Sequence, residues 1–368
     1  MSNLELINIY KKSSSFFYNE KNNIEQKSKH WQRYSMKKFN TQNLQNFRKN
    51  GELSGGLDDA SNKVSFELFS EIVNEISEEY IINNSPKKNI GNSNHLIKFK
   101  DVFIDYNKLI HIYWFWTLEN KISRINQISS ICEIGGGFGS FIELFIKNYN
   151  CKVFLIDLPE ANLMSTYYLQ QSFPKKNFFL FCDYEKKNKL TLEDFEKNDI
   201  IILPPNCNID KQIKFDLFIN TRSMMEMNKS VIKTYFDFIH NYSRNESLFL
   251  NINRYEKKSV GYPIRISEYP YDSLWKVLIS QPSFKQNWIH FLLTQRVKNS
   301  DEANIFQELN RIKKIEKSFY DILIDDSVIY LKSKKNLRVI LKRIFGTKIL
   351  KSIGNFLFKI GSKLKNID

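Results

Sequence analysis

The 368-residue sequence has few cysteines and few histidines, and neither type has the spacing of a metal site. The five histidines form no HxxxH or HExxH pair, and no CxxC pair occurs, so no metal is predicted. Widely spaced cysteines also argue against a disulfide framework and fit a reducing cytoplasm; they are Cys132, Cys151, Cys182 and Cys207. No run approaches the ~20 apolar residues of a membrane span, and the first 21 residues lack an apolar signal core. We therefore expect a cytoplasmic protein.

Acidic residues are fewer than basic ones, 40 against 55, and the imbalance is concentrated at the C-terminus. Residues 331–368 hold 11 Lys and Arg and one acid, and so carry 10 of the 15 net positive charges. A composition of 42% hydrophobic and 14% aromatic residues excludes wholesale disorder. Because the rest of the chain is nearly balanced and no recognition module accompanies the charge, nucleic acid is not an expected partner.

The basic segment 331–368 contains two apolar stripes with helical spacing. The first runs from Leu337 to Phe345, and the second from Ile349 to Leu364. Short basic amphipathic helices are typical of peripheral binding to an anionic membrane surface. The alternative is that the segment packs on the body of the protein or on a second copy of the chain, so a homo-oligomer stays open.

Apolar strands alternate with helices between residues 128 and 300. The expected strands are 128–134, 153–156, 178–181, 200–203, 215–219 and 248–252, with helices at about 140–147, 161–171 and 229–242. This alternation predicts an α/β fold with a doubly wound, Rossmann-like parallel sheet covered on both faces. Residues 1–127 are expected to form a mostly helical N-terminal cap that contributes to substrate binding. Residues 301–368 form a C-terminal helical segment that ends in the basic tail.

A glycine cluster follows the first of these strands, at 135–139. Ligands of doubly wound sheets bind beyond the carboxyl ends of the strands, where glycines permit a tight turn and a close approach of the backbone. The dinucleotide pattern GxGxxG fails because its sixth position is Ser140. The pattern present is E-x-G-x-G-x-G, which begins at Glu133. A carboxylate at this place suits a cationic amino-acid ligand, which favours S-adenosylmethionine over a dinucleotide.

Two further acids follow the next strands. Asp157 ends the second strand, where an acid accepts hydrogen bonds from both ribose hydroxyls. Asp183 follows the third strand and is a candidate contact for the adenine amino group, with Cys182 against the ring. The alternative is that glycines and acids simply punctuate the loops of any α/β fold.

The stretches EIGGGFGSF at 133–141, LIDLPE at 155–160 and FDLFINTRSMMEM at 215–227 together resemble the putative sugar O-methyltransferases. These are S-adenosylmethionine-dependent class I methyltransferases of bacterial surface-polysaccharide gene clusters, such as those for capsule and lipopolysaccharide. The blocks at 47–60, 90–95 and 268–275 extend the resemblance over about residues 30–297. One departure is Ser93, where the family pattern has proline.

The resemblance implies a methyl transfer from S-adenosylmethionine to a sugar hydroxyl, on a sugar nucleotide or a glycan. The predicted cofactor residues lie on the loops that follow the strands; they are Glu133, Gly135, Gly136, Gly137, Gly139, Asp157, Leu158, Cys182, Asp183 and Asn220. The predicted substrate residues lie in the cap and after the later strands; they are Asp58, Asp59, Asn92, Arg222, Ser223 and Arg254.

The acceptor hydroxyl needs a group that takes its proton, which contributes typically about 10²–10⁴-fold. Glu226 is the first candidate because it follows the strand 215–219 by a few residues; otherwise it caps a helix. His95, in the Gly/Asn loop of the cap, is the second. Arginines after strand ends suit the phosphate of a sugar nucleotide. Trp114, Trp116, Trp275 and Trp288 either stack on sugar faces or fill the core.

Two other functions remain alternatives. One is an NAD(P)-dependent sugar oxidoreductase, disfavoured by Ser140 in place of the last glycine. The other is a non-catalytic methyltransferase-like protein that binds a glycan or a partner, disfavoured by the intact set of Glu133, Gly135, Gly137 and Asp157.

The division of charge leads to a first prediction. Deletion of residues 331–368 is expected to weaken binding to anionic vesicles, because each Lys or Arg near such a surface contributes about 1 kcal/mol. Affinity for S-adenosylmethionine is expected to stay unchanged. Vesicle co-sedimentation of both chains measures this, and undiminished binding by the shortened chain would contradict the membrane assignment.

Overall fold

The computed structural model describes residues 1–19, 35–49, 62–258 and 260–316. The chain divides into two compact units, Met1–Leu309 and Asn310–Asp368. The basic segment 331–368 lies outside the described residues, so its predicted helices stay predictions. The predicted domain boundary between residues 127 and 128 falls within the first unit, two residues before the strand Ser130–Ile134 of the central sheet.

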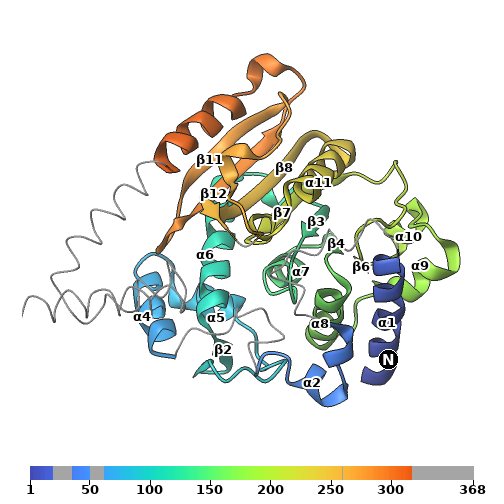
Figure 1. Cartoon of the computed structure of the whole chain (residues 1–368). Coiled ribbons are helices and arrows are strands. Elements are labelled where there is room, and N and C mark those ends of the chain that lie inside the picture. Colours follow the sequence, from blue (N-terminus) through green and yellow to red (C-terminus); the bar gives the residue numbers. More distant parts are fainter. Residues whose placement is uncertain (20–34, 50–61, 259, 317–368) are drawn as a thin grey trace, which may run out of the picture. The chain divides into compact units, whose positions relative to one another are not determined.

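An eight-stranded sheet forms the centre of the first unit (Figure 1). Its order is β11-β12-β8-β7-β3-β4-β6-β5. Six neighbouring strands are parallel: β8 (Ser243–Arg254), β7 (Phe215–Thr221), β3 (Ser130–Ile134), β4 (Lys152–Ile156), β6 (Ile200–Leu203) and β5 (Phe178–Phe179). The remaining two strands form an antiparallel hairpin, β11 (Trp275–Ser283) and β12 (Gln286–Arg296), and β12 is antiparallel to its neighbour β8. The sequence did not predict this hairpin.

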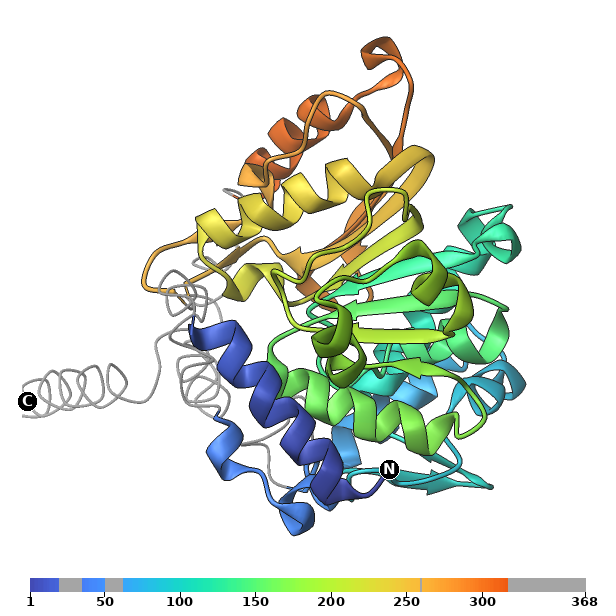
Figure 2. The same cartoon turned by 90° about the vertical axis from the view of Figure 1, so that its right-hand side faces the viewer.

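Helices cover both faces of the sheet, as the sequence predicted. Figure 2 shows α11 (Lys229–Tyr242) on one side and α8 (Pro159–Ser172), with α1 (Asn3–Asn19) over it, on the other. The apolar side chains of α7 (Ile142–Asn148) and α8 join those of β3, β4 and β6 in one core. The other face meets α11, where Phe218 contacts Phe238 edge to face. The fold is therefore a doubly wound, Rossmann-like α/β sheet.

The third predicted strand, 178–181, is shorter than expected and lies at the edge of the sheet. β5 ends at Phe179, and α9 (Phe181–Lys187) follows because the Asp183 carboxylate accepts a hydrogen bond from the Leu180 backbone N–H. The fully buried β6 lies between β4 and β5. An all-aliphatic strand needs neighbours on both sides, whereas β5 can occupy the edge. α9 and then α10 (Leu192–Lys197) connect β5 to β6.

The N-terminal region is mostly helical, as predicted. It contains α1, α2 (Thr41–Gln45), α4 (Asn62–Ile72), α5 (Glu78–Asn84) and α6 (Tyr106–Lys121), with a hairpin of β1 (Ile97–Phe99) and β2 (Val102–Ile104) before α6. α1 packs on α8 through the hydrogen-bonded pair of Tyr10 and Thr166, 2.5 Å apart, and through Tyr18, which donates to Glu160.

Buried charged side chains join this region to the glycine loop and to α7. Arg48 donates to Asp105 at 2.7 Å, and its guanidinium lies over the ring of Phe138 in the glycine loop. Lys108, only 1% exposed, donates to Glu143 at 2.6 Å and to the backbone oxygen of Ser140 at 2.7 Å. These bonds span two regions of the sequence and hold α6 against the start of α7.

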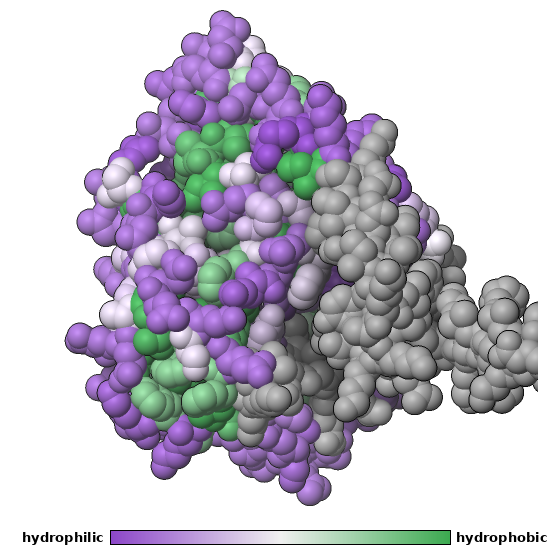
Figure 3. Space-filling view, turned by 90° about the vertical axis from the view of Figure 1, so that its left-hand side faces the viewer, coloured by the Kyte–Doolittle hydropathy of each residue, from purple (hydrophilic) through white to green (hydrophobic). Residues whose placement is uncertain are grey.

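Figure 3 shows one face of the molecule, on which separate apolar patches lie among hydrophilic side chains. None of the helices among the described residues is long and apolar enough to cross a bilayer.

The Arg48–Asp105 pair generates a second prediction. Arg48→Ala leaves the Asp105 carboxylate buried without its cation, and loss of one partner of a buried pair costs about 3–5 kcal/mol. We expect a clearly lower urea midpoint in tryptophan fluorescence. Lys233→Ala is the control, because its pair with Asp237 is exposed on α11 and its loss changes little. Equal midpoints for both variants would contradict this ranking.

Candidate functional site

The glycine loop after β3 owes its pattern to backbone conformation. Gly135, Gly137 and Gly139 all adopt positive φ, at 69°, 60° and 85°. Glycine adopts this region without steric cost, whereas other residues are strained there. The alternation in E-x-G-x-G-x-G is therefore the alternation of left-handed residues along the loop.

Gly135 and Gly136 are also required by close contacts. A Cβ atom on Gly135 would lie 1.8 Å from the Oγ of Ser223, and one on Gly136 would lie 2.5 Å from the Oε2 of Glu133. The first contact brings the loop against the turn that follows β7. The second covers the carboxylate at the end of β3.

Glu133 is fully buried in β3, between β4 and β7. Neither of its carboxylate oxygens has a hydrogen-bond partner among the described residues. Burial raises the pKa of Glu133 to about 8, and the nearby charge of Asp157 adds to the rise. A buried carboxylate without a partner is costly, and a cationic group beside it would remove the cost.

Asp157 directly follows β4 and joins the glycine loop. Its Oδ2 accepts from the Gly137 N–H at 2.9 Å, and its Oδ1 accepts from the Leu158 N–H at 2.7 Å. Burial raises the pKa of Asp157 to about 7, although these two hydrogen bonds oppose the rise. Each carboxylate oxygen keeps a further lone pair, so the group can still accept bonds from a ligand.

The turn after β7 is strained and well supported. Arg222 has a positive φ of 56°, which is unfavourable for a residue with a side chain. Asn220 holds the turn: it donates to the Ile134 oxygen at 2.7 Å and accepts from the Met224 N–H at 3.1 Å. Asn253 adds a bond to Asn220 at 2.8 Å. The side chain of Asn220 therefore supports the turn that carries Ser223 and η4 (Met224–Glu226).

Charged side chains gather at this turn. Glu226 forms an ion pair with Lys257 of β9 (Glu256–Lys257). The Arg222 guanidinium donates to Asn107 at 3.0 Å and stacks over Trp114 of α6. Burial lowers the pKa of Lys257, and the Glu226 partner opposes that shift.

A cavity of about 340 Å³ connects these loops. That volume is within the range of small-molecule sites. Nine of the predicted residues line it: Gly135, Gly136, Gly137, Asp157, Leu158, Arg222, Ser223, Glu226 and Arg254. The structure therefore brings residues from the ends of four strands, β3, β4, β7 and β8, into one site, as the sequence predicted for a doubly wound sheet.

Other predicted residues do not line this cavity. Glu133 lies beneath the loop, Gly139 packs on Leu169 and Asn220 supports the turn. Asn92 and His95 lie in the loop before β1, where Asn92 donates to Gln45 and Asn46 of the cap. Asp58 and Asp59 lie outside the described residues.

Cys182 and Asp183 are likewise away from the cavity. They lie in α9, where Asp183 caps the helix and pairs with Lys186 at 3.2 Å. The strand beside β4 is β6, and the loop after it places Pro205 in the cavity instead. The loop that was predicted to contact the adenine, with Cys182 and Asp183, therefore does not line the cavity.

His111 is a cavity residue that the sequence analysis missed. It lies in α6 and is 7% exposed, with Nδ1 at 3.3 Å from the Ser140 Oγ. Burial, helped by Arg222 and Lys108, holds the pKa of His111 well below its usual value, so the ring is neutral at neutral pH. No local motif marks it; its only signal is a histidine within an otherwise apolar helix.

Other missed lining residues come from distant elements. They are Phe17 of α1, Tyr235 of α11, and Gln286 and Ile289 of β12, whereas Trp288 of β12, which also lines the cavity, was one of the four tryptophans named from the sequence. Long-range packing alone brings these side chains together, so spacing in the sequence carries no signal for them.

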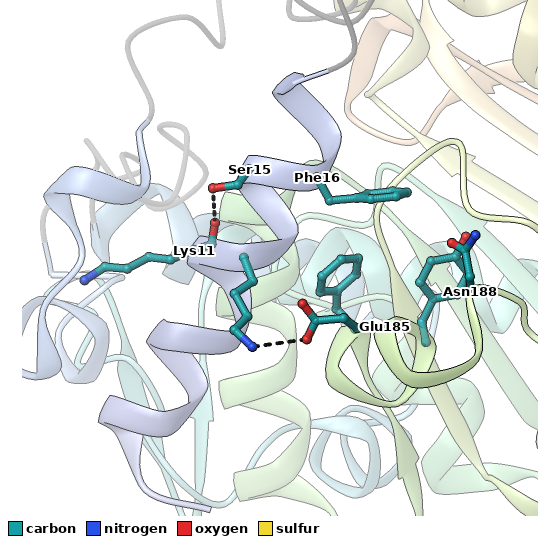
Figure 4. A pocket seen from close by; sticks show the side chains of 8 residues that line it. Lys11, Ser15, Phe16, Glu185 and Asn188 are labelled. Carbon is teal, nitrogen blue, oxygen red and sulfur yellow. Dashed lines mark hydrogen bonds and ion pairs between the residues drawn. The ribbon is translucent and has the colours of Figure 1, made fainter.

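A second hollow, of about 460 Å³, lies between α1 and α9 (Figure 4). Lys12 pairs with Glu185 across it at 3.2 Å, and the Ser15 hydroxyl donates to the Lys11 backbone oxygen. It contains none of the glycine-loop residues, so we place the functional site in the first cavity. Among the described residues, no group of three or more His, Cys, Asp or Glu is placed to hold a metal ion.

No protein-family model and no curated protein matches the chain. Among solved structures, it is similar to an S-adenosylmethionine-dependent methyltransferase from Clostridium acetobutylicum, with 11% identity over 52% of this chain and 92% of that one, at a TM-score of 0.36. An amino pentose methyltransferase from Micromonospora echinaspora shares 8% identity, over 51% and 92% of the chains, with a TM-score of 0.33.

Mitomycin 7-O-methyltransferase shares 13% identity over 52% of this chain, with a TM-score of 0.32. The match spans only 57% of that protein. At these identities and TM-scores the likeness carries nothing about the reaction or the substrate of this chain.

The buried Glu133 generates a third prediction. The folded state holds its proton up to about pH 8, whereas the unfolded chain releases it near 4.5. Stability is therefore lost as pH rises between these values, because the folded state binds more protons there. Glu133→Gln removes this loss, so the variant should exceed the wild type in stability above about pH 8, by a margin that shrinks toward pH 4.5.

Urea unfolding between pH 5 and 9 measures the difference. Glu193→Gln is the matched control, since Glu193 is exposed on α10 and pairs with Lys197. If the free energy of unfolding changes with pH in the same way for Glu133→Gln and the wild type, the Glu133 carboxylate is already ionised in the folded state over this pH range, which would contradict the prediction.

Proposed function

We propose that this protein is an S-adenosylmethionine-dependent methyltransferase that acts on a sugar hydroxyl. The observation that carries the proposal is the joint placement of Glu133 and Asp157 at adjacent strand ends around a loop of three left-handed glycines. The acceptor is a sugar nucleotide or a glycan of a bacterial surface polysaccharide. The motifs at 133–141, 155–160 and 215–227 support this choice, because they carry the resemblance to sugar O-methyltransferases.

The chain's own atoms fit this cofactor. The Glu133 oxygens are buried without partners, which suits the ammonium group of an amino acid. Gly135, Gly136 and Gly137 line the cavity with backbone and no side chain, so a ligand can approach the loop closely. Asp157 has lone pairs left for two ribose hydroxyls, and Pro205 offers an apolar surface to a base. When bound, S-adenosylmethionine supplies a methyl group on a positively charged sulfur.

The remaining residues hold the acceptor. Arg222 and Arg254 line the cavity and can bind a phosphate, because a guanidinium contacts phosphate oxygens in pairs. The strained φ of Arg222 and its stacking on Trp114 fix the direction of its side chain. Alignment of acceptor and donor is the main task of such a site.

Two cavity side chains can take the hydroxyl proton. Glu226 was the first candidate from the sequence, and it lines the cavity beside Lys257. His111 is the second: its neutral ring has a free proton-accepting nitrogen when the other nitrogen bonds to Ser140. We assign the role to Glu226 and make His111 the competing outcome. His95 stays a prediction, although it does not line the cavity.

The cofactor proposal is tested by calorimetry on the full chain. S-adenosylmethionine is expected to bind, and Asp157→Asn is expected to weaken it by roughly tenfold or more, because a bond to a charged group contributes about 1.5–3 kcal/mol. Asp199→Asn, at the opposite ends of the strands, is the control. Binding of NAD together with no binding of S-adenosylmethionine at millimolar concentration would overturn the proposal in favour of the oxidoreductase.

The same protein is then assayed for methyl transfer to a panel of bacterial sugar nucleotides. Glu226→Gln is expected to lower kcat by about 10²–10⁴-fold, the usual contribution of a general base. A loss in His111→Gln alone would move the role to His111. A loss in His95→Gln alone would restore the loop 90–95 to the active site.

A further inference from the structure

Strand β12 forms a wall of the cavity that no sequence motif marks. Gln286, Trp288 and Ile289 all line the cavity from this strand. In the sheet, Ile289 pairs with Arg254 of β8, which also lines the cavity. The wall thus combines an amide, an indole and a nearby guanidinium.

Gln286 carries an unpartnered polar atom in this wall. The residue is 3% exposed, and its Nε2 donates to the Tyr106 hydroxyl at 3.4 Å. Its Oε1 is buried and has no hydrogen-bond partner among the described residues. Because the Tyr106 hydroxyl can donate or accept, one end of the amide stays unpaired whichever way the group is turned. Such a group costs free energy unless a ligand pairs with it.

Trp288 differs from the other tryptophans of the described sheet and cap. It is 39% exposed, whereas Trp114 and Trp275 are 1% and 0% exposed and fill the core, and Trp116 is partly buried against that core and does not line the cavity. Large apolar side chains left exposed inside a ligand cavity are typical contact surfaces for a ligand. A sugar ring has an apolar C–H face that matches an indole and hydroxyls that match an amide.

We propose that Trp288 and Gln286 form the subsite for the sugar ring of the acceptor, with the ring on the indole face and one hydroxyl donating to the Gln286 amide. Arg254, the sheet neighbour of this wall, then faces the phosphate of the same sugar nucleotide. The subsite rests on the proposed function, since it specifies where the acceptor of that reaction binds. It separates ring recognition on β12 from cofactor binding on β3 and β4.

The test is saturation-transfer NMR on the full chain with UDP-, GDP- and dTDP-sugars, which needs neither turnover nor cofactor. We expect saturation of the sugar-ring protons in the wild type. In Trp288→Ala the sugar signals should fall and the dissociation constant should rise about tenfold, with Trp288→Phe largely restoring both. Leu278→Ala on β11, which is 42% exposed and does not line this cavity, is the control.

Gln286 is tested by hydroxyl specificity. The wild type should bind one deoxy-sugar nucleotide less tightly than its parent, and Gln286→Met should lose that discrimination while binding S-adenosylmethionine as before. Unchanged sugar signals in Trp288→Ala, or no bound sugar nucleotide in the panel, would overturn the subsite even if S-adenosylmethionine binds. Failure of the wild type to bind S-adenosylmethionine would instead count against the proposed function.

Discussion

The buried ammonium of Lys108 is the interaction on which the site depends. It bonds to the Ser140 backbone oxygen and to Glu143, at the point where the glycine loop passes into α7. A buried charge is tolerated only when it has well-placed partners. A shift of α6 would separate the Lys108 ammonium from these partners and leave it buried and unpaired, so the position of α6 is fixed. One helical turn further on, the same helix places His111 in the cavity. The ion pair therefore sets the distance between the cap and the loop.

A second constraint connects the glycine loop to the turn after β7. A side chain at position 135 would collide with Ser223, so only glycine fits there. The turn after β7 is also strained, because Arg222 has a positive φ. The strain is balanced by a buried asparagine network, in which Asn253 bonds to Asn220 and to the Met225 N–H. Because both loops are held by the same contacts, the groups proposed to bind the cofactor and those proposed to bind the acceptor keep one geometry.

Much of the cofactor side of the cavity could be predicted from the sequence. The glycine spacing reports left-handed backbone, and Asp157 follows an apolar strand, so each signal is local in the chain. Asp183 was placed less well. The spacing of apolar runs gives no order of strands in the sheet, and the structure places β6 beside β4 and leaves β5 at the edge, because the strand order depends on which strands gain more from burial on both sides.

The sequence by itself determined the doubly wound class of fold, the glycine loop and two acids at strand ends, because apolar runs and glycine positions act through the local backbone. Only the tertiary structure decided that Glu226 meets Lys257, that His111 enters the cavity and that Gln286 and Trp288 form its wall. These side chains come from separate elements, and the packing of those elements places them. Their meeting depends on the burial of helices and strands far apart in the chain, which leaves no short-range pattern.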